Sequence, residues 1–376
     1  MSYLLIIGNG FDKTAGLKSS YQDYFESEYY KKTFESVKSY VERVDNYIGF
    51  DLTAYDEFNC WDLLFYLKTY YTSTKPPKAG SIKWCDIEEV IHDSLYSHDA
   101  QLFNWNNIFD IVYRYYNSKN RDSIQGSINR KSLDNRVIIE YVKRKFGREL
   151  NNATDSYNQQ FFYKWLLKEL SLFEKKFGKY IEEQQKNVDY KRKAKDLIWK
   201  LGGNNGDYEM DSFNYSAFTT DENKKINHIN GDTASPIFGI SNTVSGLDND
   251  SNTILFTKTQ RRINQDTSNI LPYESRENTT HAVVFGHSLN RQDYDYFSYI
   301  FTLLKYNTLD TNKMGIVEFK FYVYDESRRA EICSRLSKSI QNLIEYYEKN
   351  VCGRDSSVLT NLLRFSGKLR ISEVIL

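Results

Sequence analysis

The sequence predicts an α/β fold in which a mostly parallel sheet carries a large helical insertion after its first strand. Three observations support this prediction. An apolar run, Tyr3–Ile7, stops at two glycines, helical periodicity then fills residues 19–201, and short strand-like runs follow. Because strands covered on both faces are continuously apolar, the opening run is typical of a buried parallel strand.

The turn after this strand is glycine-rich, as in Rossmann-like folds. Glycine has no Cβ, so Gly8 and Gly10 can adopt positive φ and let a ligand approach the backbone. A larger side chain at Gly10 is then expected to block the ligand and spare the fold. The dinucleotide fingerprint is incomplete, because Lys13 stands where its third glycine would be. A tight strand-to-helix turn without a ligand is therefore the alternative.

The middle of the chain is predicted to be helical. The clearest helix runs from Tyr157 to Gln185, where apolar residues recur at spacings of three and four. Those residues are Phe162, Leu166, Leu170, Phe173, Phe177 and Ile181. Ser19 and Ser20 indicate a helix start, and residues 104–116 and 132–146 are further helix candidates. Chain breakers at residues 202–207 end the block.

Short strands are predicted to complete the sheet, followed by a long helix at Ser327–Asn350. The predicted strands are Met210–Tyr215, Ile226–Ile229, Ile254–Phe256, Ala282–Phe285 and Val317–Tyr324. We therefore expect a nucleotide-binding core from residues 1–18 and 207–335, a helical insertion over residues 19–206, and a C-terminal helix and tail over residues 336–376.

Composition narrows the class of protein. The chain has 50 basic and 50 acidic residues, so no net charge attracts it to nucleic acid or to anionic lipid. Its four cysteines, Cys60, Cys85, Cys333 and Cys352, form no CxxC pair, which argues against a zinc site and a disulfide framework. No apolar run is long enough for a membrane span, and the amino terminus lacks the basic flank that is typical of a signal peptide. We expect a cytoplasmic protein without a metal.

Polar residues follow four of the predicted strands, in the segments IIGNGFD, SFNYS, NHING and VVFGHSLNRQD. The residues concerned are Gly8, Asn9, Gly10, Phe11 and Asp12, then Asn214, then His228, Asn230 and Gly231, and finally Gly286, His287 and Ser288. A single histidine at a strand end is most often structural. Several polar strand ends at one edge of a sheet favour a ligand site.

Together these segments resemble the AbiH family of bacterial abortive-infection proteins, which guard cells against phage. That family opens with a motif like GNGFDLAHGLPTSY, followed by FNYT, HIHG, an FG pair and GHSL near an Asp. The matching positions are Gly8 to Asp12, Gly16, Leu17, Ser20, Tyr21, Phe213 to Tyr215, His228, Gly231, Phe238, Gly239, Gly286 to Leu289 and Asp293. Trp84, Asp86 and Glu88 also look like a family signature.

A remoter resemblance is to sirtuin-like NAD-binding domains, and it implies NAD or a related nucleotide as the ligand. Gly8, Gly10 and Gly16 reproduce the spacing of the sirtuin glycine turn. Further along the chain, Asn214 matches an Asn after a strand, Gly231 an HG pair, and Gly286, Ser288 and Leu289 the GTSL ribose loop.

One departure from both families concerns the histidine before the glycine, where this chain has Asn230. His228 lies two residues upstream. If the segment is a strand, both side chains point to the same face, about 6 to 7 Å apart. That displacement is long for a general base, which needs hydrogen-bond reach.

The resemblances imply an anti-phage effector that binds NAD and cleaves its nicotinamide bond. Asn214 would orient the ribose or the attacking water, His228 or His287 would be the base, and Asp12 would stabilise positive charge. A nucleotide-binding sensor without catalysis is the alternative, and Asn230 favours it. A nuclease with Asp86 and Glu88 at its centre is a weaker third interpretation. A phage component, a second defence protein or a second copy of the chain are the partners left open.

Overall fold

The computed structural model describes residues 2–46, 57–71, 87–96, 103–151, 159–202, 208–218, 226–240, 252–264, 276–354 and 358–375. These residues form two compact units. Unit 1 contains Met1–Ser19, Gly178–Ile237 and Arg262–Leu376, and unit 2 contains Ser20–Phe177 and Phe238–Arg261. The domain limits drawn from the sequence stay a prediction.

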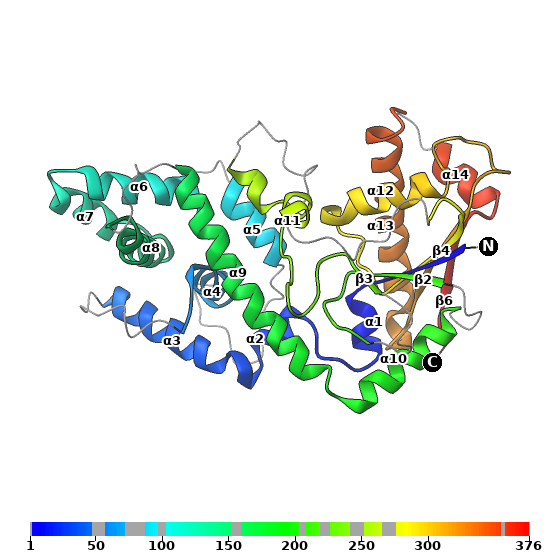
Figure 1. Cartoon of the computed structure of the whole chain (residues 1–376), viewed down its shortest axis with the longest axis horizontal. Coiled ribbons are helices and arrows are strands. Elements are labelled where there is room, and N and C mark those ends of the chain that lie inside the picture. Colours follow the sequence, from blue (N-terminus) through cyan, green and yellow to red (C-terminus); the bar gives the residue numbers. More distant parts are fainter. Residues whose placement is uncertain are drawn as a thin grey trace. The chain divides into compact units, whose positions relative to one another are not determined.

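Unit 1 is built on a six-stranded sheet with the order β3-β2-β1-β4-β5-β6, in which all neighbours are parallel. The strands are β1 (Ser2–Ile7), β2 (Tyr208–Ser212), β3 (Ile226–His228), β4 (Thr279–Phe285), β5 (Ile316–Phe321) and β6 (Leu369–Glu373). The strand labels of Figure 1 mark this sheet. The predicted α/β fold with a parallel sheet is confirmed.

The apolar run of β1 is buried because helices cover both faces of the sheet. Leu5 and Ile7 pack on a core that includes residues of α1 (Asn9–Thr14) and α10 (Val188–Lys200). Leu4 and Ile6 point to the other face. That face is covered by α12 (Tyr294–Leu303), α13 (Arg329–Asn350) and α14 (Val358–Phe365).

The chain between β1 and β2 contains the predicted helical insertion. After α1, its helices are α2 (Tyr21–Phe25), α3 (Glu28–Asp45), α4 (Cys60–Tyr66), the π-helix η2 (Leu67–Tyr71), α5 (Ile87–Tyr96), α6 (Trp105–Asn117), α7 (Arg121–Asn129), α8 (Leu133–Asn151), α9 (Gln159–Gln184) and α10. Ser20 caps α2 as predicted, because its side chain accepts the amide hydrogen of Asp23. The six apolar residues predicted to face the core from α9 are all buried.

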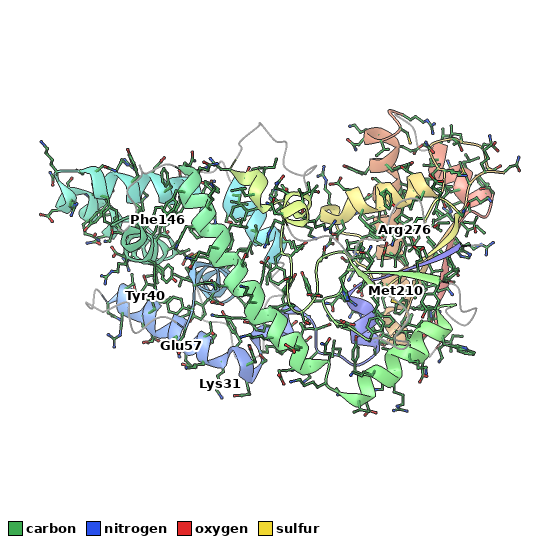
Figure 2. The ribbon with its side chains drawn as sticks, in the orientation of Figure 1. Lys31, Tyr40, Glu57, Phe146, Met210 and Arg276 are labelled. Carbon is green, nitrogen blue, oxygen red and sulfur yellow. The ribbon has the colours of Figure 1, made fainter. Side chains whose placement is uncertain are left out.

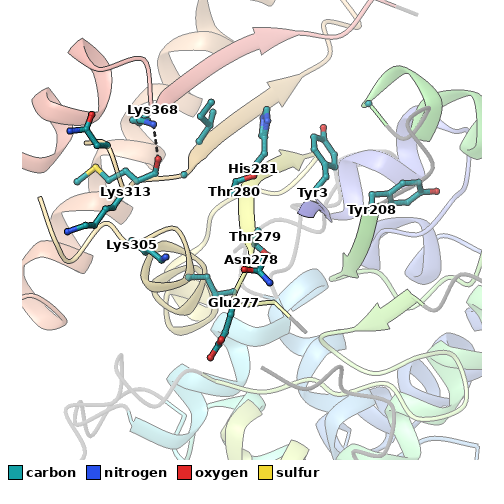
Figure 3. Close-up of a pocket in the computed structure, with 16 residues that line it drawn as sticks. Tyr3, Tyr208, Glu277, Asn278, Thr279, Thr280, His281, Lys305, Lys313 and Lys368 are labelled. Atoms are coloured by element: carbon teal, nitrogen blue, oxygen red, sulfur yellow. Dashed lines mark hydrogen bonds between the residues drawn. The ribbon is translucent and has the colours of Figure 1, made fainter. Parts of the chain in front are cut away.

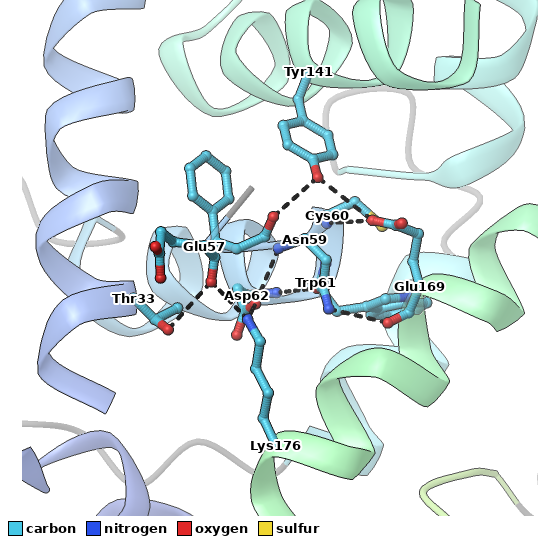
Figure 4. A network of polar contacts seen from close by, with 10 residues as sticks. Thr33, Glu57, Asn59, Cys60, Trp61, Asp62, Tyr141, Glu169 and Lys176 are labelled. Carbon is cyan, nitrogen blue, oxygen red and sulfur yellow. Dashed lines mark hydrogen bonds and ion pairs between the residues drawn. The ribbon is translucent and has the colours of Figure 1, made fainter. Parts of the chain in front are cut away.

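Unit 2 has an aromatic core and a buried polar network. Tyr40, labelled in Figure 2, is fully buried in this core, and its hydroxyl donates to the Val137 carbonyl at 3.1 Å. Figure 4 shows the network, in which Asn59 caps the start of α4 and the Asp62 carboxylate accepts the Asn59 backbone amide at 3.0 Å. The same carboxylate pairs with Lys176 at 2.9 Å. Burial raises the pKa of Asp62, and the Lys176 ammonium lowers it.

Two parts of the chain differ from the sequence prediction. Ile254–Phe256 is not a strand, because these residues lie in the 3₁₀-helix η4 (Thr253–Phe256) that precedes α11 (Lys258–Asn264). α14 and β6 follow the predicted final helix and were not predicted from the sequence. Short 3₁₀-helices η6 (Arg291–Asp293) and η7 (Glu326–Arg328) precede α12 and α13.

Within the described ranges, no helix is both long and apolar enough to cross a membrane. Cys60, Cys333 and Cys352 form no disulfide. Cys85 lies outside the described residues.

Candidate functional site

The predicted site residues of unit 1 lie at one edge of the sheet. They follow the carboxyl ends of β1, β2, β3 and β4, which are neighbours in the strand order. Because all these strands run in the same direction, their ends meet at the same edge. The direction in which successive strands are added reverses between β1 and β4. From β1 the sheet grows outward through β2 to β3, and from β4 it grows in the opposite direction through β5 to β6.

The glycine turn after β1 packs against the turn after β4. The Gly10 amide donates to the Gly286 carbonyl at 2.7 Å, and the Gly8 amide to the Phe285 carbonyl at 3.0 Å. A Cβ on Gly10 would lie 2.6 Å from the Gly286 Cα, and one on Gly8 would lie 2.7 Å from the His287 Cα. The expectation that a larger residue at Gly10 would spare the fold is therefore wrong, because the chain's own backbone occupies that space.

Asp12 is a buried carboxylate on α1, and its side chain accepts hydrogen bonds from two distant residues. The Tyr190 hydroxyl donates to Oδ1 at 2.8 Å, and the Ser216 hydroxyl lies 2.9 Å from Oδ1 and 2.8 Å from Oδ2. Burial raises the pKa of Asp12 to about 6, although these hydroxyls lower it. Among the described residues no basic group forms an ion pair with Asp12.

Asn214 connects the ends of β1 and β2. Its side-chain amide donates to the Gly8 carbonyl at 3.0 Å, and its backbone amide donates to the Ser212 hydroxyl at 3.1 Å. A side-chain hydrogen bond with Asn214 also lowers the pKa of Asp12. The structure thus brings Asp12, Asn214 and the glycine turn together, as the sequence analysis expected.

His228, the last residue of β3, is held in one tautomer. Its Nδ1 lies 3.0 Å from the Asn214 carbonyl oxygen. A carbonyl can only accept a hydrogen bond, so we assign the proton to Nδ1 and the lone pair to Nε2. Burial lowers the pKa of His228. At neutral pH this side chain is therefore an uncharged imidazole with its lone pair on Nε2, the protonation state that a general base requires.

Asn230 lies in the turn after β3, not in the strand. The condition under which strand geometry would put Asn230 and His228 on the same face is therefore not met, because the strand ends at His228. The Asn230 amide nitrogen lies 3.4 Å from the Phe213 carbonyl, and its oxygen accepts from Arg262 at 3.1 Å. Gly231 follows with φ +78°, a left-handed conformation that favours glycine.

His287 is engaged at both ring nitrogens. Its Nδ1 accepts the Leu289 amide at 2.9 Å, and its Nε2 lies 3.4 Å from an Asp293 carboxylate oxygen. The ring packs edge-on against Phe213, with 4.3 Å between the ring centroids. This surrounding favours a structural role for His287 and leaves His228 as the better candidate base.

The remaining predicted residues differ in exposure. Asn9 and Ser288 are exposed, and the Asn9 side-chain oxygen accepts the Ser19 hydroxyl at 2.6 Å. The Phe11 ring belongs to the core and stacks on Phe218, with 4.8 Å between centroids. Cofactor binding by these residues stays a prediction.

A buried ion pair beside the site was missed by sequence reasoning. Both oxygens of Asp211 accept from Arg276 at 2.7 Å, and the Asn227 amide donates to the same carboxylate at 2.8 Å. Figure 2 labels Arg276 among the side chains of unit 1. The Tyr296 hydroxyl also donates to Asp211, and its ring packs against Phe213. The one signal in the sequence for this ion pair was Asp211, a charged residue inside a segment that otherwise has the pattern of a buried strand.

The carboxylates suggested for a nuclease are only partly described. Trp84 and Asp86 lie outside the described residues. Glu88 lies on α5 and forms an ion pair with Lys258 at 2.9 Å. No group of three or more potential metal ligands occurs among the residues with a described position.

Comparison with known protein families shows to which family the chain belongs. The family described as "Bacteriophage abortive infection AbiH" matches residues 4–312. The chain belongs to the AbiH family. As an AbiH protein it is an abortive-infection protein that defends against phage. No curated protein and no solved structure matches the chain, so these comparisons add no support for a likeness to sirtuins.

The AbiH match covers the whole candidate site. It includes β1, the insertion, β2, β3, β4 and α12, and it ends before β5. Asp12, Asn214 and His228 therefore lie in the AbiH region, whereas α13, α14 and β6 lie beyond it.

Proposed function

We propose that this AbiH protein binds NAD, or a related nucleotide, at the carboxyl edge of its sheet and cleaves the bond between ribose and nicotinamide. Loss of NAD would stop the infected cell before the phage multiplies. Two features support nucleotide binding. The strand order is that of Rossmann-like sheets, which bind nucleotides at the carboxyl edge where the order reverses. The resemblance of the glycine turn to sirtuin-like domains supports NAD as the nucleotide.

The hydrogen bond between His228 Nδ1 and the Asn214 carbonyl is the observation that carries the catalytic part of the proposal. Its Nδ1 is oriented by the Asn214 carbonyl at 3.0 Å, and burial lowers its pKa. An imidazole that is oriented through one nitrogen and basic at the other is the usual arrangement of a histidine base.

The proposed reaction is a hydrolysis that needs no acid. The oxygen of a water molecule attacks the anomeric carbon of the ribose, and His228 accepts the water proton at Nε2. The bond between ribose and nicotinamide breaks, and its electron pair goes to the positively charged ring nitrogen. Nicotinamide leaves as a neutral molecule, so no proton has to be donated to it. The products are nicotinamide, ADP-ribose and one proton.

Asp12 would contribute charge to this reaction. Its pKa of about 6 means that the carboxylate is ionised at neutral pH, although it is buried. A buried negative charge favours the positive charge that develops on the ribose as the bond breaks. Asn214, which bonds to Gly8 and contacts Asp12, would hold this part of the site in place.

The alternative is a nucleotide sensor without catalysis, and Asn230 is the specific observation in its favour. The side chain of Asn230 is hydrogen-bonded to Arg262, so this position supplies no base. In that case the protein would bind NAD and pass a signal to a partner.

The test is release of nicotinamide from NAD by the purified protein and by single variants. We expect His228→Ala to lower the rate about 10²- to 10⁴-fold with little change in NAD binding. His92→Ala is the matched control, because His92 lies on α5 in the other unit, where its side chain contacts exposed Asp93 and the Tyr96 ring of the same helix.

The outcomes separate the two proposals. A parent protein that binds NAD and releases no nicotinamide would support the sensor, and Asn230→His would then restore slow hydrolysis if only the base is missing. An active parent whose rate is unchanged in His228→Ala would contradict the assignment of the base.

A further inference from the structure

A cavity lies at the opposite edge of the sheet from the candidate site, where the strands begin. Its volume is about 750 Å³, within the range of small-molecule sites. Tyr3, Tyr208, His281 and Ile316 contribute to it from the amino ends of four strands (Figure 3). Nothing in the proposed NAD chemistry uses this cavity, because that chemistry is placed at the carboxyl edge.

The floor of the cavity is a row of side chains at one register level. Tyr208 is the register partner of Tyr3, Tyr3 is the partner of His281, and His281 is the partner of Ile316. Register partners in a parallel sheet point to the same face. The Tyr3 and His281 rings lie 5.1 Å apart between centroids with their planes tilted by 51°, and Tyr208 lines the same cavity from the next strand.

Lysines surround this aromatic row. Lys305, Lys313 and Lys368 all line the cavity, and Glu277 is the acidic residue among the lining side chains. The Lys368 ammonium donates to the Met314 carbonyl at 2.7 Å, and Lys313 pairs with Asp310 at 3.1 Å. No ion pair of Lys305 occurs among the described residues. The cavity therefore combines aromatic rings with an exposed lysine, Lys305, that forms no ion pair among the described residues. Glu277 lines the same cavity, and the Glu318 carboxylate lies 3.7 Å from the His281 ring nitrogen.

The backbone of Lys305 adds an independent observation. Lys305 follows α12 with φ +61°, and the amide of the next residue, Tyr306, bonds back to the Phe301 carbonyl. This helix ending normally uses glycine, because side chains rarely adopt the left-handed conformation. Lys305 is strained there relative to glycine, as Leu289 and Leu309 are, and strained backbone positions are frequent at functional sites.

We propose that this cavity binds a small molecule with a planar ring and an anionic group, either a carboxylate or a phosphate. The ring would stack on the row formed by Tyr208, Tyr3 and His281, since offset stacking favours flat partners. The anionic group would pair with Lys305, and Lys368 lines the same cavity. The site is distinct from the NAD site, so it can be tested whether or not the protein cleaves NAD.

The experiment measures binding of 2-naphthoate and of adenosine monophosphate by ligand-observed NMR and calorimetry. The two probes distinguish a carboxylate source from a phosphate source. We expect at least one of them to bind, and we expect the neutral 2-naphthamide to bind at least about tenfold more weakly than 2-naphthoate if the carboxylate is the anionic group.

Variants locate the binding. Lys305→Met should weaken binding at least about tenfold, whereas Lys349→Met, which removes an exposed lysine from α13, should not change it. Tyr3→Leu should weaken binding more than Tyr3→Phe, which keeps the ring and loses the same hydroxyl contact to Leu201. Lys305→Gly should weaken binding and raise the midpoint of thermal unfolding, because glycine relieves the left-handed backbone.

Three results would overturn the proposal. The first is that neither probe binds the parent protein. The second is that binding is unchanged in Lys305→Met. The third is that adenosine monophosphate is the only probe bound and that NAD displaces it while Lys305→Met leaves its binding unchanged, which would place it at the carboxyl edge.

Discussion

The most informative single change is Asp12→Asn, because the structure buries this carboxylate without a basic partner among the described residues. An asparagine has nearly the same shape and cannot ionise. Its oxygen can accept from Tyr190 or Ser216, and its amide can donate to the other hydroxyl, because hydroxyl groups rotate. The variant therefore removes the charge and leaves the packing in place.

The effect on stability follows from the pKa. In the folded protein the pKa of Asp12 is about 6, above the value of 3.8 for an exposed Asp. Below pH 3.8 the side chain is protonated in both the folded and the unfolded protein, so its burial as a carboxylate does not lower the free energy of unfolding. As pH rises from 3.8 to about 6 the unfolded state loses the proton first, so stability falls, and above pH 6 the loss is complete. At about 1.4 kcal/mol per pKa unit, the full loss is about 3 kcal/mol.

Urea unfolding of the parent and of Asp12→Asn at pH 4.5 and pH 7.5 measures this difference. We expect the variant to be more stable than the parent by about 3 kcal/mol at pH 7.5 and by about 1 kcal/mol at pH 4.5. Asp196→Asn, on the exposed surface of α10, is the control and should show no such difference. If Asp12→Asn changes stability equally at both pH values, ionisation of Asp12 is not coupled to folding and the argument fails.

Three further predictions follow from the site. Gly10→Ala should destabilise the protein by about 2 kcal/mol or more in a denaturant titration, because the new methyl meets backbone atoms. Gly126→Ala, where a Cβ meets open space in a helix, should stabilise it by about 1 kcal/mol, and the reverse ranking would contradict the packing of the glycine turn. Asp211→Asn should cost about 3 kcal/mol because Arg276 stays buried with less negative charge, and an unchanged midpoint would exclude that ion pair. If NAD is cleaved, the rate should rise with pH through about 6 as Asp12 ionises, and a rate that falls over this interval would argue against a role for the carboxylate.

The sheet was predictable where a strand is buried on both faces. Tyr3–Ile7 reads as a strand because its residues alternate between two cores, and both cores are apolar. The edge strand Leu369–Glu373 was missed because it is half exposed and carries arginine and serine within five residues. Ile254–Phe256 misled the prediction, since three apolar residues fit a strand and a single helical turn equally well.

The candidate site was predictable only as a set of strand ends. Parallel strands bring their carboxyl ends together, so Asp12, Asn214 and His228 could be grouped without coordinates. The partners of Asp12 could not be found in this way. Tyr190 and Ser216 reach it across 178 and 204 residues of sequence, and no local pattern marks a hydroxyl for such a contact.

The central claim is that the site at the carboxyl edge of the sheet is required for protection against phage. It is tested most directly in infected cells. Bacteria that express the parent protein, His228→Ala or His92→Ala at equal levels are infected with a panel of phages, and the phage yield per cell is measured. We predict that the parent and His92→Ala lower the yield, that their cells die early, and that His228→Ala gives the yield of cells without the gene. Equal protection by His228→Ala and the parent would contradict the claim, because the proposed general base would then be dispensable for defence.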